Sequence, residues 1–154
     1  MNQKFLVCLY NLVAIGTVCL DQLTKKWALA HVGSGLVVNR FLSFDLEINR
    51  GISWGMLHTS SFTGFVLITT LIVAVTVAVA VHAYGRWLNN QNILGETLVV
   101  AGSSANIIDR ILYGGVIDFI HIAYQRYSWP IFNVADMTIV VGVFVMLWSN
   151  YQQE

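Results

Sequence analysis

The chain has 154 residues, of which 56% are hydrophobic and only 10% are charged, and it contains a single proline. This composition lies far from that of soluble globular domains and predicts a protein that crosses a membrane several times. The formal net charge is zero, and binding to a phosphate backbone needs clustered Lys and Arg, so nucleic acid is excluded as an expected partner.

The first apolar run, near the N-terminus, predicts a membrane helix over about residues 5–27. The run resembles a cleavable signal peptide, but no small-residue cleavage site follows it, so we expect the helix to be retained. Near its end Asp21 and Lys25 lie one turn apart on the same helix face. We interpret them as a structural ion pair that fixes the helix end, in preference to a direct catalytic role for Asp21.

The next segment alternates apolar and polar residues from Ser43 to Ile48, with the period of two of a half-buried strand. A small extramembrane β element over about residues 36–56 is therefore expected. It ends in a segment that contains Asn49, Gly51 and Gly55, where glycine allows close backbone approach or a positive φ. A plain turn leading into the membrane interface is the alternative interpretation of this segment.

Three further helices are predicted over about residues 62–84, 93–113 and 130–150. The helix over 62–84 has no charged residue and is interpreted as scaffold. The helix over 93–113 has small residues at 102–105, which favour close helix packing in a membrane. Pro130 is the expected start of the last helix. The predicted fold class is an all-α membrane protein with four transmembrane helices and one small β element, in a single domain.

Polar residues interrupt the second half of the chain at positions that are costly in a membrane, roughly 2.5–3.5 kcal/mol for each ionisable group. They are Asn106, Asp109, Arg110, Asp118, Asn133 and Asp136. Asp118 follows the third helix and Asp136 lies near the start of the fourth, so we expect both carboxylates at the same depth. Two carboxylates in a low dielectric share one proton, which suits acid–base attack on an amide carbonyl.

The remaining polar residues of this group are expected to support the carboxylates. Asn106 and Asn133 can orient them, and Arg110 can hold an anionic partner. Because Asp109 and Arg110 are adjacent on a helix and point about 100° apart, each is expected to pair with another helix. His121 is interpreted as an interfacial residue without a catalytic role, and no metal site is expected, because no helix pairs His with a carboxylate at zinc-site spacing.

Two alternatives remain open from the residues alone. Any one of these charged side chains can reach water from a helix end without a function. The same carboxylates can also serve a small transporter or a subunit that conducts protons or cations.

The motifs, in their order along the chain, resemble the bacterial lipoprotein signal peptidases, also called signal peptidase II, which are membrane aspartic proteases. The resemblance covers nearly the whole chain and rests on Asp21-Gln-Leu-Thr-Lys25, Asn49-x-Gly51-x-x-x-Gly55, Asn106-x-x-Asp109-Arg110, Val-Ile-Asp118-Phe and Phe-Asn133-Val-Ala-Asp136. It implies that Asp118 and Asp136 are catalytic. It also implies that the supporting positions are Asn106, Asp109, Arg110, Asn133, Asn49 and Gly51, with Asp21 and Lys25 as more distant ones.

The resemblance also implies a substrate and a location. The expected substrate is a prolipoprotein cut just before a cysteine that carries diacylglycerol, with membrane lipids and a cyclic peptide inhibitor of the globomycin type as further partners and no cofactor. The expected location is the bacterial cytoplasmic (inner) membrane, with cytoplasmic termini and the active site near the outer face. The count of Lys and Arg in the loops favours the opposite orientation. Ser103, Ser104 and Ala105 depart from the family's usual pattern before Asn106, and their effect on substrate preference is not predicted.

Overall fold

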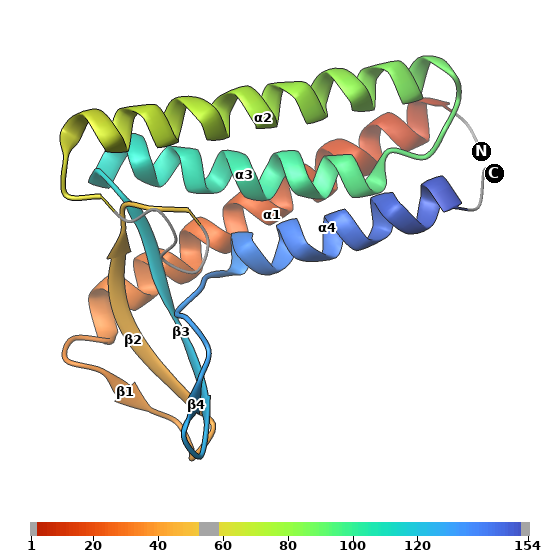
Figure 1. Ribbon diagram of the computed structural model, residues 1–154. Helices are drawn as coiled ribbons and strands as arrows, with labels where there is room; N and C mark the ends of the chain where they lie inside the picture. The colour runs from red at the N-terminus through yellow and green to blue at the C-terminus, as the bar shows by residue number, and fades with distance from the viewer. Residues whose placement is uncertain (1–2, 53–58, 152–154) are drawn as a thin grey trace.

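The computed structural model describes residues 3–52 and 59–151. Its helices are α1 (Gln3–His31), α2 (Phe62–Leu88), α3 (Leu94–Tyr113) and α4 (Val134–Tyr151). Its strands are β1 (Leu36–Val37), β2 (Leu42–Asn49), β3 (Val116–Tyr124) and β4 (Tyr127–Ser128). Figure 1 shows the helices side by side, with the sheet extending from one end of the bundle and both chain termini at the other end.

Three helices, α1, α2 and α4, are long and apolar enough to cross a membrane. The sequence predicted four such spans, and α3 differs from the others because it carries Glu96, Asn106, Asp109 and Arg110, all of which are buried. In the bundle α3 contacts each of the other three helices. Its polar residues therefore face protein instead of lipid, which is where ionisable groups at membrane depth are tolerated.

Glycines set the separation of α3 and α4. A side-chain carbon at Gly102 would lie 2.7 Å from the Ala135 carbonyl oxygen, and one at Gly142 would lie 2.8 Å from the Gly95 carbonyl oxygen. Both distances are too short for real contacts, so the helix backbones approach as closely as they do only because side chains are absent there.

The β structure is larger than the sequence predicted. The described strands form one antiparallel sheet in the order β1-β2-β3-β4, and β3 and β4 come from the segment between α3 and α4. The sequence missed β3 because its first four residues, Val116–Phe119, are all buried and so show no alternation of apolar and polar residues. The fold is thus mostly helical with a sheet, and the all-α class is corrected in this respect. The predicted β element ended at about residue 56, but residues 53–58, including Gly55, lie outside the described part of the chain.

The start of the last helix is also corrected, from Pro130 to Val134. Phe132 is still extended, because it makes a β-bridge with Ile120 of β3. The helix then begins with a reciprocal cap: the Asp136 backbone N–H donates to Asn133 Oδ1 (2.9 Å), and the Asn133 backbone N–H donates to Asp136 Oδ2 (3.3 Å). This pairing satisfies free N–H groups at the helix start, which Pro130 alone does not do.

Candidate active site

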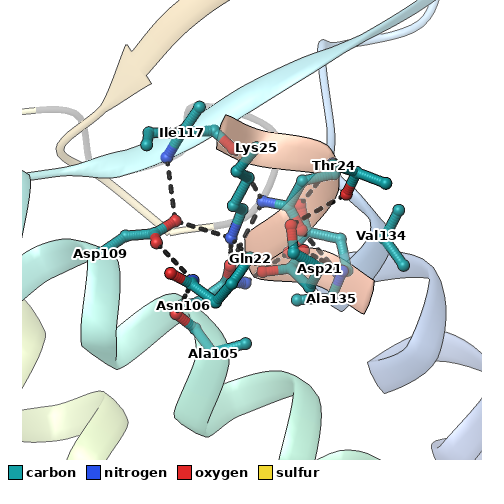
Figure 2. Close-up of polar contacts among 12 residues, drawn as sticks. Asp21, Gln22, Thr24, Lys25, Ala105, Asn106, Asp109, Ile117, Val134 and Ala135 are labelled. Atoms are coloured by element: carbon teal, nitrogen blue, oxygen red, sulfur yellow. Dashed lines mark hydrogen bonds and ion pairs between the residues drawn. The ribbon is translucent and has the colours of Figure 1, made fainter. Parts of the chain in front are cut away.

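Lys25 of α1 lies at the centre of a buried polar network (Figure 2), with only 1% of its surface exposed. Its ammonium group is 2.7 Å from an Asp21 oxygen and 2.6 Å from an Asp109 oxygen, and it donates to Asn106 Oδ1 at 2.8 Å. The predicted Asp21–Lys25 pair is confirmed, but it does more than fix a helix end. It joins α1 to α3, and Asp21 joins α1 to α4 by accepting the Ala135 N–H at 2.8 Å.

The Asn106 amide has a defined orientation because of Lys25. An ammonium can only donate, so the atom that faces it must be the amide oxygen. The Asn106 nitrogen therefore points the other way and donates to Asp136 Oδ1 at 2.9 Å. A buried cation thus presents a hydrogen-bond donor to one carboxylate of the predicted pair.

Asn133 connects the two predicted catalytic carboxylates. Its side-chain nitrogen donates to Asp118 Oδ1 at 2.6 Å, while its backbone N–H donates to Asp136 Oδ2. Asp118 lies in β3 and Asp136 in the first turn of α4, so the cap of α4 brings the strand and the helix together. The sequence placed Asp118 just beyond the third helix; the structure places it within a strand.

Asp118 is only 2% exposed and accepts a second hydrogen bond, from the Asn49 side chain at 3.0 Å. Burial, followed by the nearby Asp136, raises the pKa of Asp118 to about 7, although the hydrogen bonds from Asn49 and Asn133 act in the opposite direction. Near neutral pH this carboxyl group therefore holds a proton for a substantial part of the time.

Asp109 and Arg110 do not pair with each other. Asp109 pairs with another helix, as the sequence predicted, whereas Arg110 binds the segment after β2 instead of a helix. Asp109 bonds Lys25 and also accepts the Ile117 N–H at 3.2 Å. Arg110 donates to the Gly51 carbonyl oxygen, and its guanidinium carbon lies 6.0 Å from the centre of the Phe65 ring. Arg110 therefore holds the segment after β2 against α3, and Gly51 N–H is in turn bound by Asn49 Oδ1 at 2.8 Å.

A cavity of about 270 Å³ opens beside both carboxylates. Its polar lining includes Asn49, Asn106, Arg110, Asp118 and Asp136, and its remaining walls are mainly aliphatic. They are formed by Ile52, Leu71, Ile72, Val75, Val116 and Ile139, together with Ser103. An apolar pocket with a few convergent polar groups is the usual form of a small-ligand or catalytic site.

The structure brings the predicted residues into one hydrogen-bonded cluster, with His121 outside it. His121 lies further along β3, where Nδ1 is 2.9 Å from Asp45 Oδ2 and Nε2 is 2.7 Å from Ser128 Oγ. Within residues 3–52 and 59–151, no group of three His, Cys, Asp or Glu side chains is placed to hold a metal ion.

Two features were missed by sequence reasoning. Gln22 donates to Asp109 Oδ1 at 2.8 Å, and only its position one residue after Asp21 signals that role. At the other end of the bundle Arg86 of α2 is buried. It pairs with Glu96 at 3.3 Å and donates to Ser149 Oγ at 2.9 Å, so it joins α2, α3 and α4.

The fold and the site together define a helical membrane protein that holds one buried and one partly buried carboxylate, both hydrogen-bonded, where its helices meet a small sheet. A family model described as signal peptidase (SPase) II matches residues 13–152. Lipoprotein signal peptidases of Dichelobacter nodosus (33% identical over 145 residues) and Rhodopseudomonas palustris (35% over 147) each cover 90% of this chain, and the matches span 90% and 89% of those proteins.

A solved bacterial membrane enzyme, determined by the in meso method at 2.3 Å resolution, has a TM-score of 0.75 to this chain and 27% sequence identity. The match covers 95% of this chain and 89% of the other. The chain belongs to the signal peptidase II family. It is accordingly a peptidase, and a bacterial membrane protein.

Proposed function

We propose that the protein is an aspartic endopeptidase that removes the signal peptide from diacylglyceryl-modified prolipoproteins, cutting just before the lipidated cysteine. The observation that carries the proposal is the joint hydrogen bonding of Asp118 and Asp136 by Asn133, beside a cavity with aliphatic walls. The names of the relatives supply the substrate class, lipoproteins with signal peptides.

In the proposed reaction Asp118 is the acid and Asp136 the base. The raised pKa of Asp118 keeps a proton there near neutral pH. Asp136 accepts hydrogen bonds from the N–H groups of Asn106 and Asn133, which hold its two carboxylate oxygens in place. Asp136 takes a proton from water as the water oxygen bonds to the amide carbon, and Asp118 protonates the carbonyl oxygen. Asp136 then passes its proton to the leaving nitrogen as the C–N bond breaks. The carbonyl reforms as its proton returns to Asp118.

The aliphatic walls of the 270 Å³ cavity come from α2, α4, β3 and the segment after β2, whereas α3 contributes polar residues. They suit the apolar signal peptide and the acyl chains on the cysteine, because both enter from a bilayer. A cyclic lipopeptide inhibitor of the globomycin type would occupy the same space and so exclude substrate.

We further propose that α3 is a fourth membrane span, surrounded by the other three helices. The termini then lie at the cytoplasmic face, and the sheet and the carboxylate pair lie at the outer face of the inner membrane. The arrangement in Figure 1 supports opposite placement of these two ends, because the sheet extends from the end of the bundle that is remote from the termini.

The test uses purified full-length protein in detergent micelles and a lipidated prolipoprotein. Asp118→Asn and Asp136→Asn each remove one proton-transfer group at almost constant shape. We expect each variant to lose at least about 10³-fold in the cleavage rate, in line with groups that act as a unit. Each should keep the wild-type binding of the lipidated substrate and a cooperative thermal unfolding transition.

Undiminished cleavage by both variants would contradict the proposal. A rival function, proton or cation transport through the same carboxylates, predicts ion flux into liposomes and no peptide product. Release of the signal peptide by the wild type and its loss in both variants distinguishes the two functions directly.

A further inference from the structure

A second cavity, of about 240 Å³, also borders Asp118. It shares Asn49 and Asp118 with the aliphatic cavity described above. Its other polar lining residues are Glu47 of β2, His121 of β3 and Ser128 of β4. Asp118 therefore borders both an apolar space among the helices and a polar space over the sheet.

Glu47 gives the polar cavity a negative charge. It is exposed, and it lies directly opposite Asp118 in the pairing of β2 with β3. Within residues 3–52 and 59–151 the Glu47 carboxylate has no ion pair or side-chain hydrogen bond. A carboxylate without such a partner in the described part of the chain is available to a cationic group from outside.

His121 does not cancel this charge. Its Nδ1 faces the Asp45 carboxylate at 2.9 Å, and its Nε2 faces the Ser128 hydroxyl at 2.7 Å. A proton on the ring would be balanced by Asp45, and a neutral ring adds no charge. In either state the cavity retains the negative charge of Glu47.

We propose that this cavity receives the residue that follows the lipidated cysteine of the substrate, and that Glu47 favours a basic side chain there. The proposal rests on the proposed function. With the bond to be cut at Asp118 and the signal peptide in the aliphatic cavity, the chain after the cysteine continues into the polar cavity. Glu47 is the residue opposite Asp118 on the neighbouring strand, and such opposed residues are about 5 Å apart. Successive residues of an extended peptide are about 3.3 Å apart, so a substrate residue just past the bond at Asp118 comes within reach of Glu47.

The experiment compares lipidated peptides that differ only in the residue after the cysteine, which is Lys, Gln or Glu. For the wild type we expect kcat/KM to be about two- to fivefold higher for the Lys peptide than for the Gln peptide, the range of an exposed ion pair. Glu47→Gln should bring this ratio to about one. Glu47→Lys should reverse it and make the Glu peptide the best of the three.

Arg40→Gln is the matched control, because Arg40 is an exposed charge in the β1–β2 hairpin region, outside both cavities. If the preference for Lys arose from the summed electrostatic field of the sheet, removing the positive charge of Arg40 would raise the ratio of kcat/KM for the Lys peptide to that for the Gln peptide. If it arises from Glu47 alone, this ratio in Arg40→Gln should equal that of the wild type.

Equal ratios in the wild type and in Glu47→Gln would overturn the assignment of this subsite while leaving the proposed peptidase function intact. Failure of the wild type to cleave any of the three peptides would instead remove the proposed function, and the subsite with it.

Discussion

At the scale of single residues, the site depends on one buried cation. Lys25 pairs with both Asp21 and Asp109 and fixes the Asn106 amide, which then donates to Asp136. Removing one partner from such a cluster leaves an uncompensated charge in the interior, which costs more than the lost contact. The positions of Asp21 and Lys25, remote in sequence from the carboxylate pair, are therefore explained by hydrogen bonding through Asn106.

A pH dependence follows from Asp118. Its pKa is raised to about 7, so the proton that the proposed acid needs is present below about pH 7 and is lost above it. We expect kcat/KM to fall as the pH rises through about 7, with an apparent pKa that belongs to the pair of carboxylates. The Asn49 hydrogen bond favours the charged form of Asp118, so Asn49→Ala should move this fall to higher pH, by roughly half a unit to one unit.

Rates of peptide cleavage from pH 5 to pH 9 check this shift. Asn39→Ala is the control, because the Asn39 side chain accepts the backbone N–H groups of Phe41 and Leu42 in the β1–β2 connection, and its profile should match that of the wild type. If kcat/KM of Asn49→Ala fell at the same pH as that of the wild type, or at a lower pH, Asp118 would not be the acid that limits the rate.

At the scale of secondary structure, the long apolar runs predicted the helices because nothing else of that length and composition is stable in a membrane. The strand β3 was not predicted, since burial of both its faces removes the alternation that marks a strand. For the same reason the start of α4 was misplaced: Pro130 is a local signal, whereas the bridge of Phe132 to Ile120 is a contact with that unpredicted strand. The candidate site residues are conspicuous in the sequence because they are polar groups in apolar segments, whereas a partner such as Gln22, which binds Asp109, carries no such signal.

The α3–α4 contact yields a prediction at this scale. In Gly102→Ala the new carbon would meet the Ala135 carbonyl oxygen at 2.7 Å and Ile139 Cγ1 at 2.8 Å. The oxygen belongs to the backbone and cannot rotate away, so α4 must shift, and Asp136 moves with it. We expect a loss of about 1–3 kcal/mol of stability and at least about tenfold lower kcat.

Thermal unfolding and cleavage assays in the same detergent measure both losses. Gly16→Ala in α1 is the matched control, because no atom lies within 4 Å of the added carbon, and both its stability and its rate should be retained. Full activity in Gly102→Ala would mean that the start of α4 adjusts without moving Asp136.

At the scale of the whole molecule, burial removes one basic residue from each side of the Lys and Arg count, which leaves the orientation that the count favours unchanged and open to a direct test. Lys25, near the end of the first predicted helix, is buried between Asp21 and Asp109. At the other end Arg86 is likewise buried against Glu96. Neither residue presents its charge to a membrane surface, and the statistical rule applies to charges in short loops that do.

The orientation can be tested with single cysteines in intact cells, after Cys8 and Cys19, the two native and exposed cysteines, have been replaced by Ala. Arg126 lies at the tip of the β3–β4 hairpin, and Asn89 lies at the end of α2, where the neighbouring Asn90 bonds Gln3 of α1. With the sheet outside, a membrane-impermeant maleimide should label Arg126→Cys in intact cells and Asn89→Cys only after lysis. The reverse pattern would place the carboxylate pair at the cytoplasmic face, where a lipoprotein precursor that has already crossed the membrane would not reach it.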